Sequence, residues 1–240
     1  MLCRLYMDQE LAVGESITLP QDQAHYLRNV MRLEAGDALL LFNGRGGEYP
    51  SRIAQLNRQQ VCCLIESFSD ISREMSCKVH IVQAACRSEK IETVLQKGTE
   101  LGAASFHIVR TERSTLKLDR SKLQKRIQRW QKIVTEAVEQ SGRTLLPSVH
   151  WHNHLTEAPG YGLCFTLHPE TTTSWHAQRQ TISHATDITL AIGPEGGWSK
   201  HDIDQLSECG YQAITFGDRI MRTETAAPAL LAAIQAVAVD

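Results

Sequence analysis

The sequence of 240 residues lacks the short motifs that most often reveal a nucleotide-binding enzyme or a hydrolase. It contains no G-x-G-x-x-G fingerprint and no Gly-Lys-Ser/Thr P-loop, so neither a dinucleotide nor a nucleoside triphosphate is indicated. No serine or cysteine stands in a nucleophile elbow of the G-x-S-x-G kind. The seven cysteines form no C-x-x-C pair, a pattern typical of reduced, mostly buried thiols rather than of a disulfide framework.

Signatures of export and of membrane insertion are also missing. Residues 1–11 carry Arg4, Asp8 and Glu10 and lack the apolar core of a signal peptide. The most apolar stretch, residues 226–239, has 14 residues and is too short to span a bilayer. We therefore expect a cytoplasmic protein, and its 42% of apolar residues suffice for a globular core.

The net charge of −2 does not suggest a nucleic-acid-binding protein, but the charges are unevenly distributed. Residues 73–147 hold fifteen Lys or Arg against eight Asp or Glu, whereas residues 1–72 and 148–240 are both acidic. A basic middle region can offer one positive face to a polyanion such as RNA. It is equally typical of a solvated helix, so charge alone leaves both interpretations open.

Two patterns of periodicity divide the chain near residue 72. Residues 1–72 consist of short apolar runs and turns, with one helical pattern that begins near residue 21. Gly44, Gly46 and Gly47 lie between two of these runs and predict a hairpin. We expect a small, mostly β barrel here. Arg28 and Arg32 stand four residues apart in the expected helix, so they would share a face.

Residues 73–240 alternate between strand-like and helical segments, which predicts a mostly parallel α/β sheet flanked by helices. The expected strands cover about 77–85, 105–110, 162–167, 187–192 and 211–216. The expected helices cover about 88–102, 119–141, 199–209 and 222–238.

The most informative local pattern is "AIGPEGGWSKHD", residues 191–202. An apolar strand runs directly into a glycine-rich turn, and Ser199 then stands three residues before Asp202, a capping-box spacing that opens a helix. Glycines at the carboxyl end of a parallel strand allow backbone groups to approach a ligand. A tight turn without any ligand explains the segment equally well when it is taken alone.

Two further expected strands end in a similar way. His168 and Pro169 follow the strand at 162–167, and Gly217 with the polar "RIMRTET" follows the strand at 211–216. Because the carboxyl ends of parallel strands meet at one edge, we expect the three segments to line one small-molecule pocket. Its carboxylates and arginines suit a charged substrate or a developing oxyanion.

Other candidate sites are weaker. His150, His152 and His154 alternate in "HWHNH" and would share one side of an extended segment, but the stretch holds no Cys, Asp or Glu. We therefore expect no metal site and assign these histidines no role. Adjacent Cys62 and Cys63 suit the core, and Lys97 with Glu100 suits a surface ion pair.

Together these segments resemble the ribosomal RNA small subunit methyltransferase E family of the SPOUT superfamily. The matching stretches run in order over nearly the whole chain: "HYLRNVMRLEAGDALLLFNGRGGEY", "KIETVLQKGTELG", "RTERS", "EAVEQSGRTLLP", "LAIGPEGGWS" and "GDRIMRTETAAPAL". The resemblance implies a PUA-like, RNA-binding β-barrel over residues 1–72 and a trefoil-knotted, dimeric α/β methyltransferase domain over residues 73–240. It also implies S-adenosylmethionine as methyl donor and N3 of one uridine in 16S rRNA of the small ribosomal subunit as acceptor.

Carried over by position, the resemblance assigns a set of residues to the donor pocket. They are Leu167, His168, Gly193, Pro194, Glu195, Gly196, Gly197, Gly217, Ile220, Met221, Arg222 and Thr225. Met221 stands where the family usually has Leu, and it can make the same apolar contact. Phe216 and Asp218 also depart from the aliphatic and the small residue expected beside Gly217.

Methylation at N3 of uridine requires loss of the N3 proton and stabilisation of negative charge on O2 and O4. We expect Arg222 to stabilise that charge, with Arg219 as second choice. Glu224 would position Arg222 or accept the proton, and stabilisation of a helix N-terminus is its competing role. We expect phosphate contacts from a further set of arginines: Arg28, Arg32, Arg87, Arg113 and Arg143.

Two other functions stay open: a related knotted enzyme that methylates the ribose 2′-hydroxyl, and a non-catalytic rRNA-binding assembly protein. The glycine-rich loops favour a catalytic protein. Residues 226–239 predict a helix that is apolar on nearly all sides, and we expect a second subunit to cover its outer face.

Overall fold

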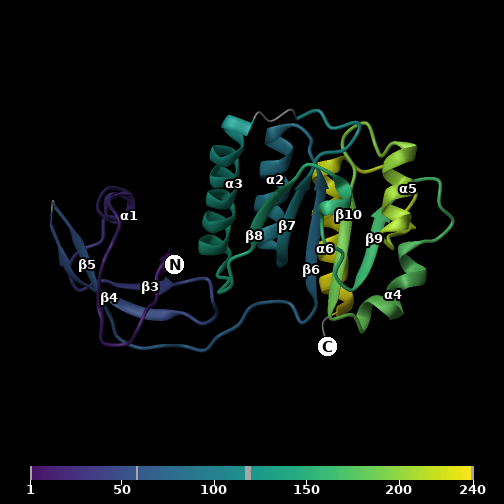
Figure 1. Ribbon diagram of the computed structural model, residues 1–240. Coiled ribbons are helices and arrows are strands. Elements are labelled where there is room, and N and C mark those ends of the chain that lie inside the picture. Colours follow the sequence, from purple (N-terminus) through teal and green to yellow (C-terminus); the bar gives the residue numbers. More distant parts are fainter. Residues whose placement is uncertain (1, 58, 117–119, 239–240) are drawn as a thin grey trace. The chain divides into compact units, whose positions relative to one another are not determined.

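The computed structural model describes residues 2–57, 59–116 and 120–238 (Figure 1). The chain divides into two compact units, which we describe separately. Unit 1 comprises Met1–Glu74 and Val138–Leu146, and unit 2 comprises Met75–Ala137 and Pro147–Asp240. The functional boundary at residue 72 stays a prediction, and the sequence did not indicate that a segment as late as 138–146 joins the first unit.

Unit 1 is built on a five-stranded sheet in the order β1-β3-β4-β5-β2. The strands are β1 (Cys3–Tyr6), β2 (Ser16–Thr18), β3 (Ala38–Phe42), β4 (Tyr49–Leu56) and β5 (Val61–Ile65). β1 pairs with β3 in parallel, and the other pairs are antiparallel. Alternate side chains such as Leu39, Leu41 and Ile53 are buried and form the core. The predicted hairpin is confirmed as β3–β4, and Gly44 in its turn has a φ of 74° that favours glycine.

The helical segment of unit 1 ends earlier than the sequence suggested. α1 (Gln21–Tyr26) passes into a π-helical turn, η1 (Leu27–Met31), and Arg32 then takes a left-handed conformation with φ of 55°. The wider turn and the left-handed residue break the α-helical spacing, so the expectation that Arg28 and Arg32 share a helix face was wrong. Arg28 instead donates a hydrogen bond to the backbone carbonyl of Asn57.

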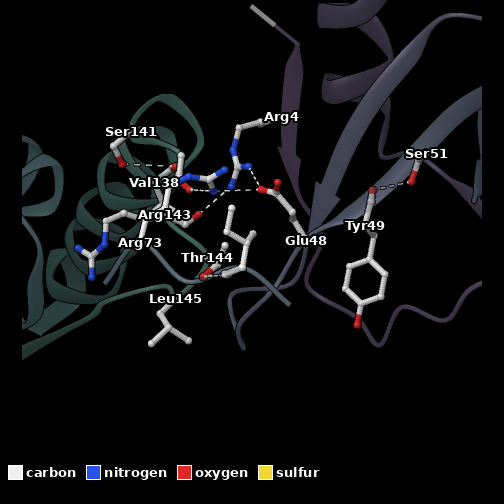
Figure 2. A network of polar contacts seen from close by, with 12 residues as sticks. Arg4, Glu48, Tyr49, Ser51, Arg73, Val138, Ser141, Arg143, Thr144 and Leu145 are labelled. Carbon is white, nitrogen blue, oxygen red and sulfur yellow. Dashed lines mark hydrogen bonds and ion pairs between the residues drawn. The ribbon is translucent and has the colours of Figure 1, made fainter. Parts of the chain in front are cut away.

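A network of charges in unit 1 is centred on Glu48 (Figure 2). Its carboxylate is 10% exposed and forms ion pairs with Arg4 and with Nη1 of Arg73, the latter at 3.2 Å. Burial raises the pKa of the Glu48 carboxyl, but the hydrogen bonds and charges of Arg73 and Arg4 bring it below its ordinary value. The same two arginines donate to the backbone carbonyls of Arg143 and Gly142, each at 2.8 Å. They fasten the segment 138–146 to β1 and to the residues after β5.

Arg143 belongs to this network, and this corrects the expectation that it contacts RNA. Its side chain is 5% exposed, and its Nε donates to the two carboxylate oxygens of Glu74 at 3.0 and 3.2 Å (Figure 2 labels Arg143). A guanidinium that is enclosed and paired in this way is not available to a phosphate group. The role of Arg143 is structural.

Replacement of Arg143 by Met is expected to lower the stability of unit 1 by about 2–4 kcal/mol, because it leaves the Glu74 carboxylate buried without its partner. Hydrogen-exchange protection of the β3 and β4 amides measures this loss. Arg45→Met is the matched control, since Arg45 of the same unit is 62% exposed and pairs with an exposed Glu10. Unchanged protection in Arg143→Met together with weaker RNA binding would instead support the expected contact of Arg143 with RNA.

Unit 2 contains a six-stranded sheet in the order β11-β9-β10-β6-β7-β8, and every pairing in it is parallel. The strands are β6 (Lys78–Ala84), β7 (Ala103–Val109), β8 (Ser148–His152), β9 (Leu163–Leu167), β10 (Asp187–Ile192) and β11 (Gln212–Ile214). The helices are α2 (Ser88–Glu100), α3 (Arg120–Ser141), α4 (Trp175–Ser183), α5 (Lys200–Glu208), α6 (Thr223–Ala238) and the 3-10 turn η2 (Leu155–Glu157). The parallel α/β architecture is therefore confirmed. β8 and α4 were not predicted from the sequence, and residue 119 of the expected helix 119–141 lies outside the described residues.

Helices pack on both faces of this sheet (Figure 1). On one face, Val82 and Ala191 pack with Leu155 of η2 and Leu206 of α5. On the other face α2 packs on β7 and α6 packs on β10, and α2 and α6 contact each other. Gly98 of α2 permits the close approach of α2 to β7, because a Cβ at this position would lie 2.7 Å from the ring of Phe106 in β7. No helix in the described residues combines the length and apolarity that a bilayer crossing requires.

The cysteines are free thiols, as expected, and four of the seven are buried. Burial raises the pKa of the Cys63 thiol to about 12, so this side chain is neutral and unreactive at physiological pH. The expected surface pair is also present, with Lys97 Nζ 2.9 Å from Glu100 Oε1.

Histidine side chains form a hydrogen-bonded row across β6, β7 and β8. His80 Nδ1 lies 2.8 Å from Ser105 Oγ, which lies 3.0 Å from His107 Nε2, and His107 Nδ1 lies 3.0 Å from His152 Nε2. His150 stacks on His107 with ring centroids 5.1 Å apart. The alternation of His150 and His152 therefore does place both on one side of a strand.

His154 precedes η2, beyond the end of β8. Across residues 2–57, 59–116 and 120–238, no group of three or more His, Cys, Asp or Glu is arranged to hold a metal ion. Burial lowers the pKa of His107 to about 3, and the charges of His150, His152 and His80 act in the same direction. Burial also lowers the pKa of His80 and of His152.

Acidification from pH 7 to pH 5 is expected to reduce the free energy of unfolding of unit 2 by about 2 kcal/mol through His107 alone. The folded pKa of about 3 lies below the ordinary value of 6.5, so the unfolded chain takes up the proton first. The stability that unprotonated His107 contributes is fully present above the unfolded pKa of 6.5, and it is lost as the pH falls toward the folded pKa of about 3. Denaturant titrations followed by fluorescence measure it, because all four tryptophans belong to unit 2.

His107→Gln is expected to remove most of this pH dependence, whereas His201→Gln, at an exposed position of α5, is expected to retain it. An identical pH dependence in the wild type and in His107→Gln would show that other groups cause the acid destabilisation.

Candidate active site

Three strand ends form one cavity in unit 2. β11, β9 and β10 are neighbours in the sheet and run in parallel, so their carboxyl ends lie at the same edge. The residues that follow them line a cavity of about 980 Å³: 168–169 after β9, 193–198 after β10 and 215–223 after β11. The convergence expected from the glycine-containing loops is thus present in the structure.

The donor loop, which we define as residues 193–198, has a conformation that depends on glycine. Gly197 has a φ of 69°, and its N–H donates to the carbonyl of Pro194 at 2.9 Å to close the turn. The predicted capping box follows: Ser199 N donates to Asp202 Oδ2, and Asp202 N donates to Ser199 Oγ, both at 3.0 Å. Strand, turn and cap together fix where the loop backbone faces the cavity.

Two arginine residues from other segments of the chain, Arg87 and Arg113, donate hydrogen bonds to the donor loop. Arg113 Nη1 donates to the carbonyls of Gly196 and Trp198 at 2.9 and 3.1 Å. The backbone N–H of Arg87 donates to Glu195 Oε1 at 3.3 Å, while the Arg87 side chain is 69% exposed. Arg113 therefore positions the loop, and the expected RNA contacts of both residues stay predictions.

A buried polar pair connects the donor loop to α6. Thr223 Oγ1 donates to the carbonyl of Gly193 at 2.6 Å and accepts a hydrogen bond from Gln83 Nε2 at 2.9 Å. Gln83 is fully buried in β6, where its neighbours are apolar. Thr223 belongs to the "RIMRTET" segment that was expected to line the pocket. Gln83 was not predicted, although one polar side chain inside the apolar run "KVHIVQAAC" was a usable signal.

Lys90, like Gln83, was not predicted from the sequence as a residue of the site. It lies in the first turn of α2 and lines the cavity. Its Nζ lies 3.1 Å from Glu224 Oε2 and 3.7 Å from Glu195 Oε1. Burial raises the pKa of the Glu224 carboxyl, but its own backbone N–H, Lys90 and Arg222 bring it below its ordinary value. Glu224 is therefore ionised at neutral pH.

Most residues expected to bind the donor line this cavity: Leu167, His168, 193–197, Gly217 and 220–222. Thr225 is exposed in the first turn of α6 and is not among the described residues that line it. Arg219 and Arg222 line the cavity, whereas Glu224 contacts it through Lys90. Ile220 is 86% exposed, so its apolar side chain is accessible for contact with a ligand.

The lining combines features that suit an organic ion with an apolar part. Ile192, Ile214, Trp198 and Met221 give apolar surface, and the glycine loops present backbone N–H and C=O groups. The charged residues that line the cavity are Lys90, Arg113, Glu195, Asp218, Arg219 and Arg222. Such a site can hold a charged small molecule and stabilise negative charge that develops on a second one.

The chain matches two family models. Residues 73–235 match the model described as an RNA methyltransferase domain, and residues 19–66 match the one described as an RNA methyltransferase PUA domain. The class is therefore an α/β methyltransferase domain joined to a PUA domain.

Individual relatives give the family. The ribosomal RNA small subunit methyltransferase E of Bacillus subtilis is 30% identical over 235 residues, which cover 94% of this chain and 92% of that protein. The enzyme of this name from Neisseria gonorrhoeae, bound to S-adenosyl methionine, matches with a TM-score of 0.89 at 30% identity over 98% of each chain. A Legionella pneumophila protein with bound SAM matches with a TM-score of 0.91 at 34% identity, also over 98% of each chain. The chain belongs to the ribosomal RNA small subunit methyltransferase E family.

Thr223→Val is expected to weaken binding of S-adenosylmethionine about tenfold, because it removes the donor to the Gly193 carbonyl and one of the acceptors of Gln83. Isothermal calorimetry measures the affinity. Thr93→Val, at an exposed position of α2, is the matched control. Equal affinities for the wild type and Thr223→Val would show that this hydrogen bond does not shape the donor loop.

Proposed function

We propose that this protein transfers a methyl group from S-adenosylmethionine to N3 of a uridine in 16S rRNA of the small ribosomal subunit, in the cytoplasm. The observation that carries the proposal is the cavity at the carboxyl ends of β9, β10 and β11, in a chain whose relatives bear the corresponding name and bind this donor. The same proposal includes a trefoil knot, an RNA-binding PUA-like domain over residues 1–72 and a catalytic domain over residues 73–240.

The cavity fits the donor on the chemistry of its lining. S-adenosylmethionine, when bound, supplies an electrophilic methyl group on a positively charged sulfur. The backbone of the donor loop and of residues 217–222 would hold it, together with Leu167 and His168. Apolar Ile192, Ile214 and Met221 offer contacts for a purine ring, and the carboxylate of Glu195 favours a cation.

The acceptor needs groups that stabilise an anion, since a uridine that has lost its N3 proton carries charge on O2 and O4. Arg222 is our proposed partner for this charge, and Arg219 of the same loop is the second choice. The lowered pKa of Glu224 makes it a weak base, and it faces Lys90. We therefore propose that Glu224 acts by positioning and that the proton leaves by another path, such as water.

RNA binding would use arginines outside the charge network of unit 1 and would require an accessible base. We retain Arg28, Arg32, Arg87 and Arg113 as proposed contacts, with phosphates as the expected partners. N3 lies on the pairing edge of uracil, so the target must be unpaired or turned out of its stack before methyl transfer.

A homodimer through α6 is also part of the proposal. Leu230 and Ile234 are buried within the chain, at 1% and 0% exposure, so they belong to the core of unit 2. The exposed positions of α6 include Ala232 and Ala236, whose small side chains permit close approach of another helix. The contact that covers α6 would therefore be made by this alanine face.

The test is to incubate small ribosomal subunits that lack the modification with labelled S-adenosylmethionine and to analyse the nucleosides after digestion. Wild-type protein is expected to produce N3-methyluridine. Arg222→Ala is expected to lower turnover at least about 100-fold while its donor affinity stays within about threefold, because the lost charge acts mainly on the transition state.

Arg179→Ala, an exposed position of α4, is the control and should behave as the wild type. A 2′-O-methylated product would favour the ribose methyltransferase, and binding of rRNA without binding of donor would favour a non-catalytic assembly protein. Near-normal turnover in Arg222→Ala would remove Arg222 from the mechanism.

A further inference from the structure

Lys90 comes from a part of the chain outside the three loops that the glycine patterns identify. β6 is the direct neighbour of β10 and parallel to it, so residues 85–90 after β6 begin at the edge of the sheet where the donor loop begins. Lys90 lies in the first turn of α2 and lines the cavity there. Its position places a positive charge between two other segments of the site.

The contacts of Lys90 join these two segments. Its ammonium nitrogen lies 3.1 Å from Glu224 Oε2 at the start of α6 and 3.7 Å from Glu195 Oε1 in the donor loop. The three side chains are 18%, 21% and 22% exposed, so solvent screens their charges only in part. Glu195 also accepts hydrogen bonds from Arg87 N at 3.3 Å and from Thr115 Oγ1 at 3.5 Å.

We propose that Lys90 is a positioning residue of this active site, which holds Glu195 of the donor loop and Glu224 of α6 close together beside the cavity. Both carboxylates lie within 4 Å of one nitrogen atom, and without that cation they would repel each other. The donor loop and the start of α6 would then separate or one carboxyl would take up a proton.

The charge of this triad matters because the proposed donor is a cation. Glu195, Glu224 and Lys90 together contribute one net negative charge to a cavity whose lining also holds Arg113, Asp218, Arg219 and Arg222. The other charged groups that act on the pair are Arg222 beside Glu224 and Arg87 beside Glu195. Neither arginine lies between the two carboxylates, and Lys90 contacts both.

Carbon-13 NMR titration of the Glu224 carboxyl tests the inference directly. In Lys90→Met the pKa of Glu224 is expected to rise, because burial then acts without the ammonium group that lies 3.1 Å from this carboxylate. Donor affinity measured by calorimetry is expected to fall about tenfold, and its loss on acidification to begin at higher pH. Lys90→Arg keeps the charge and is expected to stay within about threefold of the wild type.

A double-variant cycle shows whether Lys90 acts through Glu224. If it does, the loss of donor affinity in Lys90→Met/Glu224→Gln is smaller than the sum of the losses in the two single variants, and any loss that remains in the Glu224→Gln background is the part that acts through Glu195. Lys97→Met is the matched control, because Lys97 of the same helix pairs with Glu100 and is 48% exposed. It is expected to leave both the Glu224 titration and the donor affinity unchanged.

The inference is overturned if the titration of Glu224 is the same in the wild type and Lys90→Met, or if the losses of the two single variants multiply. It rests on the proposed function only for the identity of the donor. A wild type that binds no S-adenosylmethionine would refute the proposed function, whereas the carboxyl titration would still decide the role of Lys90. A different methylated product would leave both readouts of Lys90 intact.

Discussion

The parallel pairing of β11, β9, β10 and β6 is the constraint on which the candidate site depends. Parallel strands send every carboxyl end to one edge, so loops that are far apart in the chain begin side by side. The donor loop, the loop after β11 and the first turn of α2 meet there for this reason. An antiparallel neighbour at any of these positions would carry its loop to the opposite edge and remove one wall of the cavity.

The cavity is shaped largely by backbone, and polar side chains from other segments hold that backbone in place. Arg113 supports the donor loop through its carbonyls, and Thr223 connects the same loop to α6 and to buried Gln83. Burying a polar group without a hydrogen-bond partner is costly, so the hydrogen bonds of Thr223 and Gln83 restrict the loop to few alternative conformations. Preorganised loops of this kind can hold a ligand without a large reordering cost on binding.

The basic middle region shows why a count of charges is a poor guide to RNA contacts. Arg143 is paired with Glu74 inside unit 1, and Arg129 of α3 makes a two-point contact with Glu92 at 2.8 and 3.0 Å. Several charges that make residues 73–147 basic therefore hold the protein together, and fewer remain for a polyanion than the sequence suggested.

The sequence by itself determined the class of fold, because the change from short β runs to alternating strands and helices is a local pattern that depends on side-chain periodicity. It also determined the hairpin at Gly44, the capping box at Ser199 and the three loops of the cavity, since turns and caps depend on residue types at fixed spacing. Only the tertiary structure decided the π-helical turn at Leu27–Met31, the strand β8, the burial of Arg143 and the position of Lys90 between two carboxylates. The last three depend on contacts between residues far apart in the chain, and a distance of 140 positions, as between Gln83 and Thr223, leaves no periodic signal in the sequence.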